Sequence, residues 1–179
     1  MNALQTMESP VGILTLIAEA GAIRGIYFET HRHAPGLAPG VPASGEDLRV
    51  LREAERQLRA YFDGALRSFD LPLAARGTPF QERTWTALRA IPFGERCSYA
   101  ALAATIGAPR AVRAVGGANG RNPLSIVVPC HRVIGSDGSL TGYGGGEERK
   151  RWLLAHELHV AGRGWPEVVS EPRTEPACD

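Results

Sequence analysis

The sequence changes character at Ala74–Gly77, and this change limits the possible folds more than any other feature. Residues 1–75 contain short apolar stretches separated by turn residues, which is typical of strands, whereas residues 76–160 contain helix caps and apolar residues at helical spacing. A length of 179 residues is enough for two small domains. We therefore expect an α/β domain over 1–75, a mainly α domain over 76–160, and a tail over 161–179 whose lack of periodicity predicts disorder.

The first part of the chain predicts a strand hairpin followed by a helix. Its apolar stretches are interrupted by Gly-, Ala- and Pro-rich segments, and one later stretch has apolar residues at helical spacing before a glycine stop. In chain order, the expected elements are strands at Val11–Ile17 and Ile23–Phe28 around a turn at Glu19–Ala22, a loop at His31–Ser44, a helix from Leu48 to Phe62 ending at Gly64, and a further strand at Ser68–Leu73.

The second part predicts several short helices. A threonine followed by proline, and a serine before an apolar run, are typical helix starts. The expected helices begin after Thr78-Pro79, run over Tyr99–Ile106 with Ser98 as the cap, run over about Arg110–Ala118 after Pro109, and run over about Glu147–Leu158. The middle two are joined by a short segment that contains Gly107, a pattern that indicates a helix-turn-helix.

Charge is distributed unevenly along a chain whose net charge is only +1. Residues 76–160 carry eleven basic and six acidic side chains, whereas residues 1–75 carry seven and nine. A basic second part beside an acidic first part indicates a module that binds a polyanion. Chance scatter of surface charge explains the same numbers, so charge alone leaves both interpretations open.

Cysteine usage and hydropathy narrow the class of protein. The three cysteines, Cys97, Cys130 and Cys178, cannot all pair, and their spacing matches no zinc motif. No apolar run approaches the ~20 residues of a membrane span, and no basic segment starts a signal peptide. We expect a reduced, cytoplasmic, monomeric protein with no metal, no other cofactor and no membrane partner.

The segment from Ser125 to Ile134 carries the clearest chemistry. An apolar run delivers Cys130 to a proline, Pro129, and His131 and an arginine follow immediately. A thiol reacts as the thiolate, and a free cysteine with a pKa of ~8.5 is mostly protonated at neutral pH, so a nearby base is needed. Adjacent side chains on an extended segment point in opposite directions, so contact requires a turn, or a water between the groups. Pro129 favours a turn at this point. Without further context, a buried inert cysteine explains the residue equally well.

A set of motifs between Phe80 and Glu157 closely resembles the O6-alkylguanine-DNA alkyltransferases, also called methylated-DNA–protein-cysteine methyltransferases. The motifs occur in family order at compatible spacing: Ser98-Tyr99, Arg113-Ala-Val-Gly-Gly-Ala118, Asn122-Pro123, Pro129-Cys-His-Arg-Val133, Gly142-Tyr143 and Trp152-Leu-Leu-Ala-His-Glu157. The resemblance implies a ribonuclease H-like α/β domain followed by a winged helix-turn-helix-like domain. It implies direct reversal of DNA damage, with one alkyl group moved irreversibly from O6-alkylguanine to the protein, and O4-alkylthymine as a further candidate substrate.

The resemblance also implies catalytic roles. Cys130 matches the alkyl acceptor, His131 the base that acts through a water, and Glu157 the carboxylate that orients the histidine. Asn122 matches the asparagine that ties the recognition helix to the active-site loop. Displacement at an alkyl carbon needs a strong nucleophile, which a thiolate provides.

The remaining implied roles concern double-stranded DNA that contains O6-alkylguanine. A base inside a duplex must be flipped out to reach a protein thiol. Arg113 matches the arginine that fills the gap, and the missing side chains of Gly116 and Gly117 let the helix approach DNA closely. The other matched residues belong to the substrate and DNA-binding set: Tyr99 and Tyr143 beside the base, the carbonyl of Val128 at the guanine edge, and Arg132.

Each of these residues also has a plainer interpretation. Tyr99 can pack a helix, Arg113 can be a solvated surface residue, and Asn122 can be a turn residue. For the whole chain, two other functions compete: a damage sensor or DNA-binding regulator without catalysis, and a Cys-His-Glu hydrolase. Sensors of the alkyltransferase-like type lack the cysteine that Cys130 provides, and a hydrolase leaves the helix-turn-helix unexplained. The glycine-rich loop Thr141–Gly146 leaves open the preference for methyl or bulkier adducts.

Overall fold

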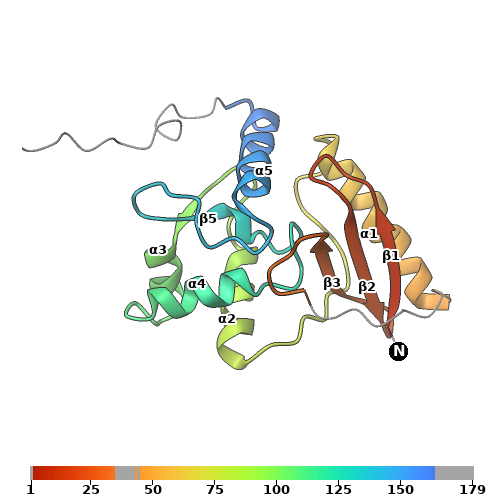
Figure 1. The fold of residues 1–179 in the computed structure, drawn as a ribbon, viewed down its shortest axis with the longest axis horizontal. Helices are drawn as coiled ribbons and strands as arrows, with labels where there is room; N and C mark the ends of the chain where they lie inside the picture. The colour runs from red at the N-terminus through yellow and green to blue at the C-terminus, as the bar shows by residue number, and fades with distance from the viewer. Residues whose placement is uncertain (1, 35–42, 44, 164–179) are drawn as a thin grey trace, which may run out of the picture.

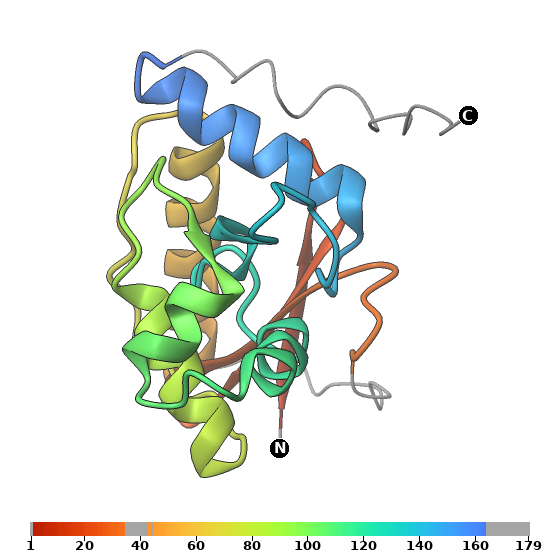
Figure 2. The same cartoon turned by 90° about the vertical axis from the view of Figure 1, so that its left-hand side faces the viewer.

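The computed structural model describes residues 2–34, 43 and 45–163, and Figures 1 and 2 show two views of it. A small antiparallel sheet and helix α1 form one side, and a mainly helical region forms the other, as the change at Ala74–Gly77 predicted. The boundaries of the two predicted domains stay a prediction. The loop expected over 31–44 and the tail expected over 161–179 lie largely outside the described residues.

The sheet is a meander in the order β1-β2-β3, formed by Ala3–Met7, Leu14–Glu19 and Ala22–Phe28. The expected hairpin turn is confirmed: Ala20 and Gly21 both have positive φ, as the type I′ turns that suit twisted strands require. The strand expected over Val11–Ile17 begins three residues later, because a tight turn closed by hydrogen bonds between Ser9 and Gly12 precedes it. Strand β1 was not predicted.

Helix α1, Gly45–Phe62, covers the sheet with one apolar face. Its buried residues recur at intervals of three and four, which puts them on one stripe of the helix: Val50, Leu51, Ala54, Gln57, Leu58 and Tyr61. The helix ends just before Gly64, as expected. Near this end, the hydroxyl of Tyr61 points towards Glu157 of the second region.

The strand expected over Ser68–Leu73 is wrong. Only Leu73 forms a bridge, to Ile23 of β3. The backbone of Asp70 is instead held by the side chain of Gln57, which accepts from its N–H at 2.8 Å and donates to its carbonyl at 2.7 Å. A side chain thus supplies the hydrogen bonds that a neighbouring strand would otherwise provide.

Short helices dominate the second region, as predicted. They comprise α2 (Pro79–Arg89), α3 (Tyr99–Thr105), α4 (Val112–Gly120), the 3₁₀ turn η1 (Cys130–Arg132) and α5 (Glu147–Val160), with β4 (Cys97–Ser98) and β5 (Val133–Ile134) paired in parallel. Thr78 and Gln81 form a capping box at α2, and Ser98 caps α3. Helix α4 begins two residues later than predicted, because Ala108–Ala111 forms a turn closed by a hydrogen bond between the backbones of its end residues.

The two regions share one buried apolar cluster, and β3 joins them directly. Ile26 donates its N–H to Pro123 at 2.8 Å and accepts from the N–H of Ser125 at 3.2 Å. The edge of the sheet therefore supports the segment that leads to Cys130. No helix of the described part is both long and apolar enough to cross a membrane.

Replacing Leu51 by alanine should test the α1–sheet interface. Leu51 is fully buried, so we expect a loss of about 2–5 kcal/mol in the free energy of unfolding, from lost apolar transfer and the cavity left behind. The adjacent exposed residue Arg52 provides the control, and Arg52→Ala should change stability by less than about 0.5 kcal/mol. Urea denaturation followed by circular dichroism measures both, and equal losses would contradict the packing described.

Candidate active site

The segment 125–132 turns sharply twice before it presents the thiol. Ile126 has a φ of 74°, and the N–H of Val127 donates to the carbonyl of Ser125 at 2.9 Å, which makes a γ-turn of the rare, strained kind. Pro129, with φ −81° and ψ 61°, makes a second γ-turn of the common kind, closed by the N–H of Cys130 at 2.8 Å from the carbonyl of Val128. A positive φ at a β-branched residue is costly and persists only where the surroundings enforce it.

The 3₁₀ turn Cys130–Arg132 follows these two turns, which confirms the turn expected at Pro129. It places the thiol and the imidazole on a tight helical turn rather than on opposite sides of a strand. Cys130 is 3% exposed, and His131 is fully buried. The thiol is therefore shielded from water in this structure.

Asn122 holds the thiol with its side-chain amide. Its Nδ2 donates to Sγ of Cys130 at 3.0 Å and to the carbonyl of Val128 at 2.8 Å, while its Oδ1 accepts from the N–H of Leu124 at 3.0 Å. The amide thus uses both donors and its acceptor, and its orientation follows from these bonds. Asn122 is consequently more than the turn residue that its position before Pro123 allowed.

The pKa of the Cys130 thiol is raised by burial to about 11, although the hydrogen bond from Asn122 and the positive charge of Lys150 act in the opposite direction. Lys150 is itself buried, and burial lowers its pKa to about 8. Its ammonium lies over the rings of Tyr99 at 5.6 Å and Tyr143 at 5.9 Å. A thiol in this state is protonated at neutral pH and needs a base before it can react.

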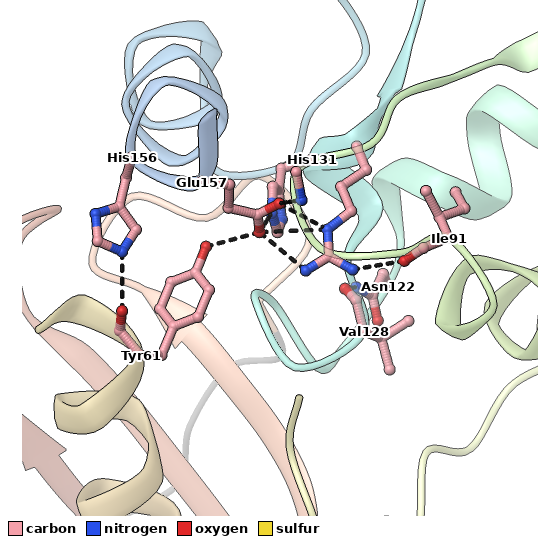
Figure 3. Close-up of polar contacts among 9 residues, drawn as sticks. Tyr61, Ile91, Asn122, Val128, His131, His156 and Glu157 are labelled. Carbon is pink, nitrogen blue, oxygen red and sulfur yellow. Dashed lines mark hydrogen bonds and ion pairs between the residues drawn. The ribbon is translucent and has the colours of Figure 1, made fainter. Parts of the chain in front are cut away.

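The buried carboxylate of Glu157 accepts hydrogen bonds from four residues (Figure 3). Its carboxylate oxygens accept from Nε2 of His131 at 2.7 Å, from Nε and Nη2 of Arg132, each within 2.9 Å of one oxygen, from the hydroxyl of Tyr61 at 2.9 Å and from the N–H of Gly94 at 2.9 Å. Burial opposes ionisation, but the nearby His131 and Arg132 hold the pKa of Glu157 well below its usual range. The carboxylate is therefore charged and only accepts.

This carboxylate fixes the tautomer of His131. Since Nε2 donates to Glu157, Nδ1 carries the lone pair, and Nδ1 is buried with no hydrogen-bond partner among the described residues. Burial lowers the pKa of His131, with Glu157 acting in the opposite direction. A neutral imidazole with a free acceptor nitrogen, on the residue next to a protonated thiol, is arranged to take a proton.

Two matches with protein-family models cover nearly all of the described chain. Residues 3–75 match the ribonuclease-like domain of 6-O-methylguanine DNA methyltransferase, and residues 79–159 match its DNA binding domain. The chain belongs to the 6-O-methylguanine DNA methyltransferase family.

Whole-chain relatives agree with this family. The chain is 48% identical over 157 residues to the methylated-DNA–protein-cysteine methyltransferase of Mycolicibacterium paratuberculosis, covering 88% of this chain and 93% of the relative. It is 44% identical to the constitutive methyltransferase of Bacillus subtilis, covering 86% and 94%. A crystal structure of Mycobacterium tuberculosis OGT in complex with DNA superposes with a TM-score of 0.82 at 46% identity, covering 88% and 94%.

The structure brings the residues matched to catalytic roles in this methyltransferase family into one buried cluster. These are Cys130, His131, Glu157 and Asn122. Tyr143 is also buried, and its hydroxyl has no hydrogen-bond partner among the described residues. Tyr99 is half-buried, and its hydroxyl donates to the carbonyl of Thr141 at 2.9 Å.

The other matched residues divide between the surface and the interior. Arg113 is exposed on α4, and Gly117 lines an open groove of about 650 Å³ beside it. A Cβ atom at Gly116 would lie 3.9 Å from the ring of Tyr99. Arg132 is only 6% exposed and bonds Glu157 and the carbonyl of Ile91. The carbonyl of Val128 already accepts from Cys130 and Asn122.

Three side chains at this site were not predicted from the sequence. Tyr61 lies on the buried face of α1, where a tyrosine is ordinarily part of the core. Asn119 is buried on α4, and its Nδ2 donates to the carbonyl of Cys130 at 3.3 Å. Lys150 could have been singled out from the sequence, because it is the chain's only lysine among twenty basic residues. His156 packs on Trp152 and hydrogen-bonds the carbonyl of Tyr61 at 2.8 Å, away from the thiol. Within the described ranges, no group of three His, Cys, Asp or Glu side chains is placed to hold a metal ion.

The Glu157→Gln variant should show how much the buried carboxylate stabilises the fold. Removing its charge leaves Arg132 buried without an oppositely charged partner, so we expect a loss of about 3–5 kcal/mol at pH 7. Because the pKa of Glu157 is lower in the folded than in the unfolded chain, this stabilisation is present above the usual carboxyl pKa and is lost as pH falls through the folded value. Thermal unfolding from pH 7 down to pH 3 should therefore show the stability difference between the two proteins beginning to narrow below about pH 4.5, the ordinary carboxyl pKa.

Glu148→Gln is the matched control for this comparison, because Glu148 is exposed on the same helix. Its effect at pH 7 should stay below about 1 kcal/mol, as expected for a charge near a helix start. A gap between wild type and Glu157→Gln that does not narrow in acid would contradict the ionised state assigned to Glu157.

Proposed function

We propose that this protein repairs alkylated DNA by direct reversal, through transfer of an alkyl group from O6 of guanine to Sγ of Cys130. The observation that supports the proposal is a buried thiol that accepts a hydrogen bond from Asn122, next in sequence to a histidine that is bonded to Glu157. Nδ1 of that histidine, His131, has no hydrogen-bond partner among the described residues. Membership of the methyltransferase family supports the same chemistry. Transfer is stoichiometric, because a thioether is a poor leaving group and no group of the described site is suited to remove it.

Thiol activation is the first step. His131 takes the proton of Cys130 at Nδ1, directly or through a water, and Glu157 stabilises the imidazolium that forms. Lys150 and the amide of Asn122 then stabilise the thiolate. We assign Arg132 to holding Glu157 rather than to DNA, since its guanidinium is buried against that carboxylate.

Alkyl transfer then exchanges one bond for another. The thiolate attacks the methyl carbon, a sulfur–carbon bond forms, and the carbon–O6 bond breaks with its electron pair going to the guanine. Hydrogen-bond donation to the guanine stabilises this charge, and the tyrosines are the donors. Burial raises the pKa of Tyr99 to about 12 and raises that of Tyr143 well above its usual value, so both hydroxyls keep their protons.

DNA binding falls to the α3–α4 pair as a winged helix-turn-helix-like unit. The groove between the start of α2 and α4 is lined by Arg110, Arg113 and Arg121, which favour phosphate contacts. Arg113 has no hydrogen bond or ion pair to another described residue, so it is available to fill the gap that a flipped guanine leaves. Because Gly116 and Gly117 have no side chains, the backbone of α4 is accessible next to Tyr99 and the groove.

Several finer expectations remain part of this proposal. The first region is taken as a ribonuclease H-like domain over 1–75 and the second as the DNA-binding and acceptor domain over 76–160. The protein acts as a cytoplasmic monomer on double-stranded DNA that contains O6-alkylguanine, with O4-alkylthymine as a further substrate.

Mass spectrometry tests the proposed transfer. After incubation with duplex oligonucleotide that bears O6-methylguanine, the intact protein should gain one methyl group, and a peptide map should place it on Cys130. Cys130→Ala should gain none, while Cys97→Ala, which removes the half-exposed cysteine, should gain one. Tight binding with no mass change would support a damage sensor instead, and turnover of an ester or amide would support a hydrolase.

Arg113→Ala tests the base-flipping role. We expect it to slow repair of duplex DNA about tenfold or more, because the gap in the stack is no longer filled, while reaction with free O6-methylguanine base changes little. Arg110→Ala, in the same groove, serves as the control for a simple phosphate contact: it should weaken DNA binding and reduce its salt dependence. Equal losses of Arg113→Ala on duplex and free base would contradict the assignment.

A further inference from the structure

We infer that Tyr61 is a positioning residue for alkyl transfer, which holds Glu157 from the N-terminal region and so keeps the imidazole of His131 oriented as a proton acceptor. The inference rests on the proposed function, since it concerns how the same site is kept ready. Tyr61 lies ninety-six residues before Glu157 in the chain, on the last turn of α1, and its side chain is fully buried. Figure 3 shows its hydroxyl pointing at the carboxylate of Glu157, to which it donates at 2.9 Å.

The hydroxyl is not needed to neutralise or satisfy the carboxylate. Oε2 of Glu157 has the N–H of Gly94 and Nε of Arg132, both at 2.9 Å, and Oε1 has His131 and Nη2 of Arg132. The guanidinium also balances the negative charge. Tyr61 therefore adds a third strong donor to Oε1, the oxygen that binds the imidazole, and competes there with His131.

The ring of Tyr61 is anchored so that the hydroxyl has little freedom. Its neighbours are the rings of Phe62, Phe69, Phe93 and His156, with centroids 5.3–6.0 Å away. The guanidinium of Arg132 lies over the ring of Phe93, with its Cζ atom 5.7 Å from the ring centroid. One aromatic cluster thus fixes both the phenol and the guanidinium that hold Glu157.

The hydrogen bond from Tyr61 also affects the pKa of His131, and the direction of this effect follows from electrostatics. Burial, and then the negative charge of Glu157, raise the pKa of Tyr61 well above its usual value, so the phenol only donates. Donation to Oε1 spreads the charge that would otherwise stabilise an imidazolium. Loss of the hydroxyl should therefore raise the pKa of His131 and protonate it at a higher pH.

Other groups around His131 and Glu157 also influence the pKa of His131, and removal of the Tyr61 hydroxyl leaves them in place. They come from η1, the Thr141–Gly146 loop and α5: Cys130, Arg132, Tyr143, Lys150 and His156. The charges of Arg132 and Lys150 lower the pKa of His131, and that of Glu157 raises it. Helix α1 adds Tyr61 to the groups that influence the pKa of His131.

The test is Tyr61→Phe in the full chain, which removes one oxygen and keeps the ring packing. Single-turnover methyl transfer from O6-methylguanine duplex is followed from pH 5 to pH 9. We expect the plateau rate to fall about three- to tenfold, as for loss of one hydrogen bond at the reacting site, and the acid limb to move up by about half a pH unit. The Kd for damaged duplex should stay within about twofold, because Tyr61 is buried away from the surface.

Phe69→Leu is the matched control, because it loosens the same aromatic cluster and leaves the hydroxyl in place. It should lower Tm without moving the acid limb. An acid limb unchanged in Tyr61→Phe, or moved equally in both variants, would overturn the inference.

A second measurement separates this inference from the proposed function. The titration of His131, followed by NMR of the imidazole in protein without DNA, should give a higher pKa in Tyr61→Phe than in wild type. This readout does not require methyl transfer. A wild type that never methylates Cys130 would refute the proposed function, whereas an unchanged His131 titration in Tyr61→Phe would refute only the role of Tyr61.

Discussion

The buried carboxylate of Glu157 is the contact on which the rest of the structure depends. It is reached by side chains or backbone from α1, from the loop after α2, from η1 and from α5 itself, so four distant parts of the chain meet at one group. An ionised carboxylate inside a protein is tolerated only when donors surround it. The same donors that make this charge tolerable also orient the imidazole beside the thiol, so stability and chemistry draw on one set of contacts.

A second constraint comes from backbone geometry just before the thiol. Ile126 is fully buried and has positive φ, and the sheet edge at Ile26 holds the chain on one side of it while Asn122 holds it on the other. Strain of this kind is retained where the surroundings over-determine a conformation. It lets an apolar run reverse direction within a few residues and enter the 3₁₀ turn that places Cys130 beside His131.

The sequence predicted local features better than distant ones. Capping at Thr78 and Ser98, the hairpin turn, and the proline turn before Cys130 all depend on neighbours in the chain, and the structure confirms them. The segment Ser68–Leu73 failed because a side chain, Gln57, supplies the hydrogen bonds of Asp70. Tyr61 could not be singled out, since a tyrosine on an apolar helix face is ordinarily core, and its partner Glu157 is distant in sequence. The family motifs, by contrast, located the cluster around Cys130 directly.

The order in which the ribosome makes the chain gives the Glu157 contact a further consequence. The thiol emerges before helix α5 exists, so a growing polypeptide carries its nucleophile without the carboxylate that orients the base. The carboxylate that orients the imidazole is therefore in place only once α5 has packed against the end of α1. Removal of α5 by proteolysis would likewise leave Cys130 and His131 in the chain without the carboxylate of Glu157.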